Sequence, residues 1–423
     1  MSRRSVAVVG SGVAGLTAAY VAQKHADVTL FEADNRLGGH AHTHDLSADD
    51  GASVGVDTGF IVHNERTYPT LLRLFAELGV LTQDSDMSMS VRCGGCGLQY
   101  AGARGLRGLF PVARRACEPR YLRMLGEVLK FHRRARRVLA SREDETAGAQ
   151  TLGEFVRDGH YSAYFSAHFV TPLISAVWSC SPELAMQYPA RYLFQFLANH
   201  GMLSVTGTPQ WRTVVGGSGR YVELAAKGLT AVRTATPVRS VERTGTGVRI
   251  RDADDQVGLF DAVVIATHPN QALAMLAAPT ATERELLDAI PYSLNPTVLH
   301  TDTSVLPRAV GAQASWNYYL PSCDVPAAEV HVSYDMNRLQ RLETPTRYLV
   351  TLNDGGEIDP ALVIDRMSYE HPVFTPTSVA AQRRLPELND GTMAFAGAYH
   401  GWGFHEDGCK SGVDAAASLG LEW

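Results

Sequence analysis

A glycine-rich hexapeptide near the start of the chain has the composition of a phosphate-binding turn. Residues 10–15 read Gly-Ser-Gly-Val-Ala-Gly, and the acidic residue Glu32 follows 22 residues after the first glycine. In such a pattern the first glycine permits a tight turn, the second lets the backbone approach a pyrophosphate, and the third lets a helix pack against a strand. A carboxylate at the position of Glu32 accepts hydrogen bonds from a ribose 2′-hydroxyl. The two features together predict a dinucleotide site.

The hydrophobic pattern around this motif predicts the elements that must hold it. The apolar run 6–9 indicates a buried strand, 13–23 has the spacing of a helix, and 28–32 indicates a second strand. A strand, a helix and a strand in this order imply a parallel sheet. The free N–H groups and the positive dipole at the start of the helix would face the phosphates. The chain is therefore predicted to be an α/β protein that begins with a Rossmann-type domain.

The residues after Glu32 separate the two dinucleotides, NAD and FAD, that use this motif. Arg36-Leu37-Gly38-Gly39 follows directly, and here the chain resembles the flavin amine oxidase and phytoene desaturase superfamily, in which such a loop wraps the pyrophosphate of FAD. The paired glycines of 216–218, the apolar strand 263–267 and the closing segment 396–412 are also similar to that superfamily. The resemblance implies FAD as the cofactor. It implies a glutathione-reductase-like parallel sheet, interleaved with an α+β substrate domain that contains an antiparallel sheet.

The resemblance also assigns the cofactor-binding residues and the order of the domains. The expected cofactor-binding residues are Gly10, Gly12, Val13, Ala14, Gly15, Glu32, Ala33, Arg36, Gly38, Gly39, His40, Asp57, Thr58, Gly59, Phe60, Val238, Ala266, Thr267, Gly397, Ala398, Gly403, Phe404, His405 and Gly408. The FAD-binding domain is expected to comprise residues 1–85, 209–290 and 390–423, and the substrate domain residues 86–208, mostly helical, and 291–389, with the antiparallel sheet. Two positions depart from the superfamily, because His40 stands where many amine oxidases have Arg and Ala398 where many members have Asp. Donors near Gly408, just before a helix expected from about residue 409, are then expected to replace the missing carboxylate.

Candidate general bases occur in segments that the superfamily places near the flavin ring. They are His63 and Glu65 after segment 57–60, His268 after strand 263–267, and His405 in an aromatic loop that spans 399–405. A structural interpretation competes for the first two, since Asn64 can cap a helix and a glutamate is favoured in a first helical turn. Glu370-His371-Pro372 is a weaker candidate segment.

Further motifs narrow the resemblance to one bacterial subfamily. Segments 56–62, 64–69, 209–214, 314–318 and 403–408 look like the predicted NAD/FAD-binding oxidoreductases encoded beside methyltransferases similar to cyclopropane fatty acid synthases. This implies dehydrogenation of a fatty acyl chain and a functional link to a lipid methyltransferase. Amine oxidation is the main competing activity, but stretch 291–299 lacks the lysine that amine oxidases of the superfamily often have there. The resemblance is also compatible with isomerisation of a double bond and with an accessory role beside the methyltransferase.

One strongly basic segment stands out in a chain of formal net charge −6. Residues 104–142 contain 12 Arg or Lys but only two acidic residues. The residues expected on the buried helix face are Tyr121, Leu125, Val128, Leu129, Ala135 and Leu139. We expect the basic face to contact an anionic membrane surface, with a solvated helix face as the competing interpretation. The overall charge gives no indication of nucleic-acid binding, and without a long apolar run the protein is expected in the cytoplasm, partly at the inner face of the membrane.

The six cysteines include one closely spaced pair, Cys93-Gly-Gly-Cys96. A zinc site would need two more ligands at suitable spacing, and no second cysteine pair follows. The residues around the pair read as a hairpin with a glycine tip. The sequence therefore predicts a hairpin here and no metal site.

Overall fold

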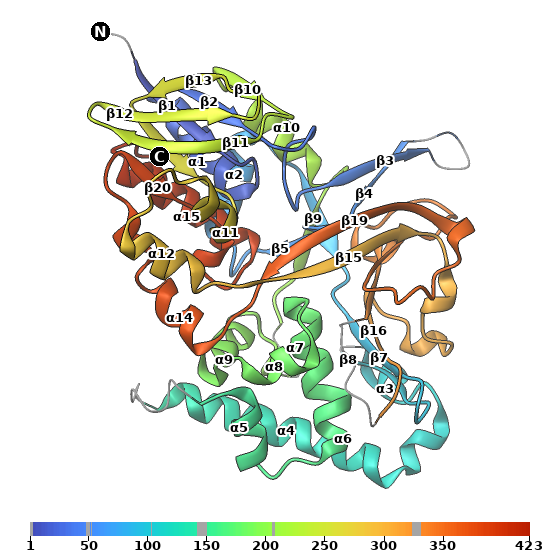
Figure 1. Cartoon of the computed structure of the whole chain (residues 1–423). Coiled ribbons are helices and arrows are strands. Elements are labelled where there is room, and N and C mark those ends of the chain that lie inside the picture. The colour runs from blue at the N-terminus through green and yellow to red at the C-terminus, as the bar shows by residue number, and fades with distance from the viewer. Residues whose placement is uncertain are drawn as a thin grey trace.

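The computed structural model describes residues 3–47, 51, 53–102, 104–141, 150–204, 208–323 and 331–423. Figure 1 shows an upper region built around β1 and β2 and a lower region of helices beside a second sheet. The expected α/β class, with one parallel sheet and one largely antiparallel sheet, is confirmed. The exact domain boundaries stay a prediction.

The upper region is a five-stranded parallel sheet with the strand order β10-β2-β1-β14-β20. Its strands are β1 (Arg4–Val9), β2 (Ala26–Phe31), β10 (Ala231–Arg233), β14 (Ala262–Ile265) and β20 (Met393–Phe395). Val6 and Val8 pack toward helices α1 (Val13–Gln23) and α15 (His405–Ser418). Ala7 and Val9 pack on the other face, toward a three-stranded sheet. That sheet consists of β11 (Val238–Thr244), β12 (Gly247–Asp252) and β13 (Val257–Phe260). Both faces are covered, which explains why these strands are continuous apolar runs.

The second sheet has seven strands in the order β19-β15-β18-β17-β16-β7-β8. They are β7 (Met89–Cys93), β8 (Gln99–Gly102), β15 (Tyr292–His300), β16 (Trp316–Leu320), β17 (Val332–Asp335), β18 (Leu349–Leu352) and β19 (Val363–Pro372). All neighbours are antiparallel except β16 and β7, which are parallel. The predicted hairpin at 86–100 is confirmed as the β7–β8 pair, and it joins the edge of a sheet formed mainly by residues 292–372.

The helices of the lower region follow β8 in the sequence and end at Asn199. They are α3 (Gly105–Leu109), α4 (Pro119–Ala140), α5 (Leu152–Asp158), α6 (Ala163–Phe165), α7 (Thr171–Trp178), α8 (Pro182–Gln187) and α9 (Ala190–Asn199), with a π-helical turn at Ser166–Val170. Pro172 and Pro182 stand in the first turns of α7 and α8, and Pro189 stands directly before α9. At α8 and α9 the proline stands at a helix start, where it loses no hydrogen bond. Helix α7 instead continues from the π-helical turn, so Pro172 lies within a longer helical run.

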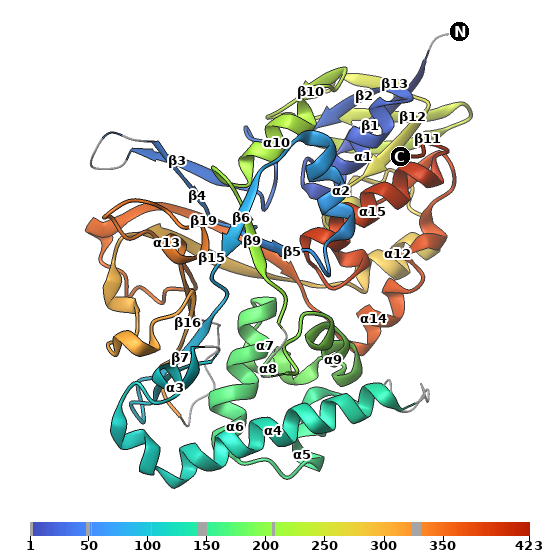
Figure 2. The same ribbon diagram turned by 180° about the vertical axis from the view of Figure 1, so that it is seen from behind.

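The remaining elements are short. They are the hairpin β3 (Thr43–Ser47) and β4 (Ser53–Asp57), the small sheet of β5 (Val62–Asn64), β9 (Trp211–Val214) and β6 (Thr82–Ser85), and the helices α2 (Pro69–Leu78), α10 (Gly219–Ala226), α11 (Pro269–Met275), α12 (Ala281–Asp288), α13 (Met336–Leu339) and α14 (Pro376–Gln382). Figures 1 and 2 place β5 and β9 between the parallel sheet and the helices below.

Two details of the helices differ from the sequence prediction. Helix α15 begins at His405 instead of about residue 409, because the Asp407 carboxylate accepts a hydrogen bond from the Phe404 amide and starts the helix earlier. Leu129 of α4 was expected to face inward but is 55% exposed, because the helix turns Met124 and Phe131, both fully buried, toward its neighbours. Among the described residues, none of the helices combines the length and the apolar composition needed to cross a membrane.

Candidate active site

A cavity of about 900 Å³ extends from the carboxyl ends of the parallel strands to the seven-stranded sheet. Most of the predicted cofactor-binding residues line it: Gly10, Gly12, Val13, Ala14, Glu32, Ala33, Arg36, Gly39, His40, Thr58, Gly59, Phe60, Val238, Ala266, Thr267, Gly397, Ala398, Gly403, Phe404 and His405. The carboxyl edge of an open parallel sheet is where such folds bind their ligands. Segments from both ends and the middle of the chain therefore meet at one site.

The glycine turn leaves open space where a pyrophosphate must approach. A Cβ atom on Gly12 would meet no atom within 4 Å, although the residue lies directly at the start of α1. A Cβ on Gly15, in contrast, would lie 1.9 Å from the Gly10 carbonyl oxygen, so Gly15 serves helix–strand packing and does not line the cavity. The Leu16 amide donates to the Gly12 carbonyl at 2.9 Å, and the amides before it belong to the open first turn of the helix. This cradle fits a diphosphate.

The Glu32 carboxylate stands beside this turn at the end of β2. It accepts hydrogen bonds from the Ser11 amide at 2.8 Å and from the Asp34 amide at 2.9 Å, and also from the Ser11 hydroxyl. An ionised carboxylate offers about four acceptor sites. Glu32 can therefore hold the turn in place and still accept a hydrogen bond from a ribose.

The loop after Glu32 is fastened to the glycine turn. The Arg36 guanidinium donates to the Gly39 carbonyl at 2.8 Å, and the Gly38 amide donates to the Ser11 carbonyl at 3.2 Å. A Cβ on Gly39 would lie 3.2 Å from the Gly12 Cα. Gly38 does not line the cavity. Its amide instead joins the loop to the glycine turn through the hydrogen bond to Ser11. The loop thus forms a second wall of the diphosphate cradle.

His405 lines the cavity as the first residue of α15. Its ring stacks on Phe60 with 3.7 Å between centroids, and Nε2 lies 3.1 Å from the Tyr221 hydroxyl. Burial, with a smaller contribution from His63, lowers the pKa of His405 to about 3. The imidazole is therefore neutral near pH 7, and we assign it to the wall of the cofactor cavity.

Two other predicted cofactor residues lie behind the cavity wall. Asp57 accepts hydrogen bonds from the Ser218 amide, the Ser218 and Thr43 hydroxyls and the Gln340 amide, so it fastens the start of α10 to β4. A Cβ on Gly408 would lie 2.6 Å from a Val13 methyl, so this glycine allows α15 to pack on α1. Sequence analysis places the start of α15 near Gly408, where its donors would take the place of the carboxylate missing at Ala398. In the structure this helix start lies at His405.

The candidate bases His63 and Glu65 also lie outside the cavity lining. His63 is completely buried, and neither ring nitrogen has a hydrogen-bond partner among the described residues. Burial, with a contribution from Arg212, lowers the pKa of His63 to about 4. Glu65 is exposed at the surface. Asn64, the expected helix cap, closes the turn before α2 by accepting from the Arg66 amide at 2.9 Å.

Helix α2 is capped by a residue that the sequence did not suggest. The Glu406 carboxylate accepts hydrogen bonds from the Thr70 and Leu71 amides, each at 2.9 Å. A carboxylate at a helix start also complements the helix dipole. The first turn of α15 is thereby tied to α2.

His268, the remaining candidate base, lies in the cavity wall together with its partner Glu370. Its Nδ1 lies 2.8 Å from the Glu370 carboxylate, and its ring stacks on Tyr292 at 4.2 Å. Burial lowers the pKa of His268, against the raising effect of Glu370. A neutral ring whose Nδ1–H donates to a carboxylate leaves Nε2 unprotonated. This is the arrangement of a general base.

Three further polar side chains line the cavity with His268: Tyr369 and His371 of β19, and His40, which directly follows the Arg36–Gly39 loop. The His40 ring lies 5.3 Å from the His371 ring and 5.0 Å from the Tyr369 ring. The Tyr369 hydroxyl lies 2.7 Å from the Thr58 hydroxyl. Only the weak signal of Glu370-His371-Pro372 pointed to this strand, and Tyr369 was missed because a tyrosine in a strand is usually a packing residue.

The inner part of the cavity, toward the seven-stranded sheet, is mostly apolar, with the Ser179 hydroxyl beside Tyr334 as a polar group. It is lined by Ile61, Met87, Val177, Trp178, Met202, Trp316, Tyr334 and Leu352. These residues come from separate strands and helices, and nothing in their local sequence distinguishes them from core residues. Sequence analysis therefore could not identify them as a site.

Comparison with known proteins identifies the family. The family model described as flavin containing amine oxidoreductase matches residues 13–313. A triple mutant of putrescine oxidase has a TM-score of 0.71 at 16% sequence identity and covers 98% of both chains. Cyclohexylamine oxidase from Brevibacterium oxydans has a TM-score of 0.68 at 17% identity, covering 99% of this chain and 98% of its own. A fatty acid isomerase from P. acnes that produces CLA has a TM-score of 0.70 at 15% identity and covers 98% of both chains. At these identities the structures show a shared fold alone, whereas the family model covers most of the chain. The protein therefore belongs to the flavin-containing amine oxidoreductase family and is an FAD-dependent oxidoreductase.

Proposed function

We propose that the protein dehydrogenates a fatty acyl chain bound in the inner part of the cavity. The observation that carries this proposal is the apolar lining between Ile61 and the seven-stranded sheet. Apolar pockets with a few polar groups at one end suit a chain whose reacting carbons lie near the polar end. The polar end here consists of His268, Glu370 and Tyr369.

The charges in the cavity favour an acyl chain over an amine. Among the described lining residues, the carboxylates are Glu32 and Asp34 at the glycine turn and Glu370, which is bonded to His268. The described lining of the inner part therefore contains no carboxylate that could pair with the ammonium group of an amine. A buried cation needs such a partner. The described lining also contains no lysine, in agreement with the sequence of β15.

His268 would remove the proton in this reaction. Dehydrogenation breaks two C–H bonds on adjacent carbons and forms a carbon–carbon double bond. One hydrogen leaves as a proton, which Nε2 of His268 can accept while Glu370 stabilises the resulting imidazolium. Bound FAD supplies the acceptor for the second hydrogen, which leaves with its bonding electrons as a hydride.

Anaerobic mixing of the purified flavoprotein with candidate substrates tests the proposal. Loss of the oxidised flavin absorbance with an acyl thioester or a phospholipid, together with a new double bond in the product, supports it. Flavin reduction by putrescine or cyclohexylamine but by no lipid would overturn it in favour of amine oxidation. A double bond that moves without net flavin reduction would overturn it in favour of isomerisation.

We also propose that helix α4 contacts an anionic membrane. Leu122 and Leu129 are 43% and 55% exposed, and their separation of seven residues places them on the same face of the helix. Lys130, Arg133 and Arg137 are exposed around them. An exposed helix face with leucines between basic residues is typical of helices that lie on membrane surfaces. Arg115 does not contribute, because it is buried and bonded to Glu118.

Sedimentation with vesicles tests the membrane contact. The protein should bind phosphatidylglycerol vesicles at low salt and lose this binding as salt rises. The double variant Arg133→Glu, Arg137→Glu should weaken binding at least about 30-fold, since each lost basic residue contributed about 1 kcal/mol and each new carboxylate is repelled by the anionic surface. The matched control is Arg220→Glu, Lys227→Glu at α10, which changes the same charge on another exposed helix. Equal binding of both double variants would contradict the proposal.

A further inference from the structure

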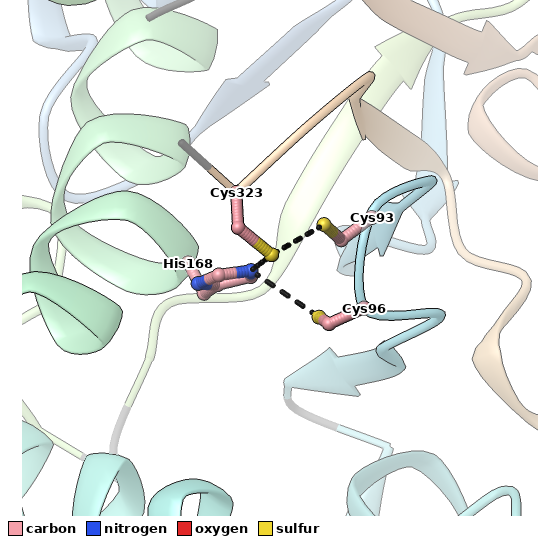
Figure 3. A group of neighbouring side chains, drawn as sticks. All are labelled: Cys93, Cys96, His168 and Cys323. Atoms are coloured by element: carbon pink, nitrogen blue, oxygen red, sulfur yellow. Dashed lines mark hydrogen bonds between the residues drawn. The ribbon is translucent and has the colours of Figure 1, made fainter. Parts of the chain in front are cut away.

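Four side chains that bind metals converge in the lower region, away from the cavity. Cys93 ends β7, Cys96 lies in the turn before β8, His168 lies in the π-helical turn after α6, and Cys323 follows β16. Figure 3 shows all four pointing toward one another from three separate parts of the chain. None of them lines the active-site cavity.

The distances between the ligand atoms fit one tetrahedral ion. The Cys93 and Cys323 sulfurs lie 3.5 Å apart, and the His168 Nε2 lies 3.5 Å from the Cys96 sulfur and 3.6 Å from the Cys323 sulfur. All four ligand atoms lie within 4.8 Å of one another. Zinc bonds of about 2.3 Å to sulfur and about 2.0 Å to nitrogen place the ligands of a tetrahedral site roughly 3.5–3.8 Å apart. The Cys93–Cys323, Cys96–His168 and Cys323–His168 separations fall in this range, and the other three are at most 4.8 Å.

His168 is held in the orientation that a metal ligand requires. Its Nδ1 lies 2.9 Å from the Tyr164 carbonyl oxygen, and its ring stacks on the Tyr164 ring at 4.0 Å. The Nδ1–H therefore donates to the backbone, and Nε2 faces the three sulfurs with its lone pair. Histidines that bind metals usually donate their second N–H in this way. The π-helical turn, a feature frequent at functional sites, displaces His168 from the regular helix path.

The two glycines between Cys93 and Cys96 allow the third cysteine to approach. A Cβ on Gly94 would lie 2.7 Å from the Pro321 carbonyl oxygen, and a Cβ on Gly95 would lie 2.9 Å from the Cys323 nitrogen. The Cys93 amide donates to the Leu98 carbonyl at 2.9 Å and closes the turn. A plain hairpin tip needs no such contact with a distant segment. The glycine pair thus serves the convergence of the cysteines.

We propose that Cys93, Cys96, His168 and Cys323 bind one Zn²⁺ ion in a closed structural site. Three thiolates and one imidazole select zinc among the common divalent metals, and four protein ligands leave no position for a substrate. The ion joins the β7–β8 hairpin to the helical region and to the segment after β16. Sequence spacing did not reveal the site, because His168 lies 72 residues after Cys96 and Cys323 a further 155 residues away.

Metal analysis of the purified flavoprotein tests this proposal. After removal of any affinity tag and exhaustive desalting, plasma mass spectrometry should find about one zinc ion per chain. Cys96→Ser and His168→Ala should lower the zinc content about tenfold or more. The control is Cys117→Ser, which removes an exposed cysteine on the neighbouring 3-10 helix and should leave the zinc content unchanged.

Two further measurements decide the outcome if the variants do not fold. His168→Cys supplies a fourth thiolate and should retain zinc where His168→Ala loses it. In the wild-type flavoprotein, a strong chelator should lower the melting temperature, and added zinc but not magnesium should restore it. A wild-type protein that contains no zinc and takes up none when it is added would overturn the proposal. So would iron in place of zinc, or a Cys93–Cys323 disulfide found by peptide mapping without reduction.

Discussion

Glu32 offers the most direct test of how the chain holds FAD. Its carboxylate accepts hydrogen bonds from the Ser11 and Asp34 amides and from the Ser11 hydroxyl, and it lines the cavity beside the glycine turn. The substitution Glu32→Ala therefore removes two things: the support of the turn and the acceptor for a ribose hydroxyl. Loss of the support lowers the stability of the apoprotein. Only loss of the ribose acceptor lowers the affinity for FAD directly.

The size of the effect follows from the charge of the acceptor. A hydrogen bond to an ionised carboxylate contributes about 1.5–3 kcal/mol. Its loss should raise the dissociation constant of FAD roughly 10- to 150-fold. The turn should tolerate the change better, because Glu32 is only partly buried and water can replace the lost acceptor at the two amides. We expect the melting temperature of the apoprotein to fall by only a few degrees, in keeping with a loss of about 1 kcal/mol or less.

Titration of apoprotein with FAD, followed by flavin fluorescence, measures the effect. Glu65→Gln is the control, because it neutralises an exposed carboxylate that lies outside the cavity lining. Its dissociation constant should stay within about twofold of the wild type, as expected for an exposed charge. The reasoning is refuted if Glu32→Ala binds FAD as tightly as the wild type does, or if both variants lose the same affinity.

Three other predictions concern the same site. Gly12→Val should abolish FAD loading while the apoprotein melts within about 2 °C of the wild type, since its Cβ meets open space, and flavin-to-protein absorbance checks this. His268→Gln should slow substrate-dependent flavin reduction about 100-fold or more with FAD content unchanged, and an unaltered rate in stopped-flow absorbance would exclude the base. Burial lowers the pKa of His63 and His371 to about 4 and that of His405 to about 3, so the unfolded chain binds these protons first as pH falls. The free energy of unfolding should decline as pH falls from about 6.5 toward about 4, because these histidines outnumber Asp57 and Asp407, whose pKa values burial raises to about 6 and about 7 and which act in the opposite direction. A flat profile in urea unfolding would contradict this.

The parts of the fold that the sequence predicts are those set by local patterns. Helix α1 has the predicted bounds, Val13–Gln23, because an apolar strand, a glycine turn and a helical spacing follow one another without interruption. Glu32 lies directly after β2 as expected, and most of the predicted cofactor residues line one cavity. A motif that combines strand, turn and helix fixes its own geometry, so its residues are placed correctly before any long-range contact is known.

The misplaced residues depend on contacts between distant segments. Gly408 was assigned to the cofactor but packs α15 against Val13, and its type alone does not distinguish a backbone that approaches a ligand from one that approaches a helix. Glu65 stands in a polar cluster, yet its position on the surface is set by the pairing of β5 with β9. Leu129 faces solvent because α4 presents Met124 and Phe131 to the neighbouring helices.

The proposed zinc site and the substrate cavity are connected by the seven-stranded sheet and by α7, which follows the π-helical turn of His168 and places Val177 and Trp178 in the cavity wall. The parallel pairing of β16 with β7 sets Leu320 beside Cys93, which brings Cys323, a little further along the chain, to the hairpin turn. Trp316 at the other end of β16 and Tyr334 on β17 line the apolar part of the cavity. Loss of the ion would therefore reach the cavity through β16 and through α7, and any change in activity would combine metal loss with a change in the packing of both elements. Metal content, which does not depend on the sheet's other contacts, is for this reason the readout that separates the zinc proposal from the proposal of acyl-chain oxidation.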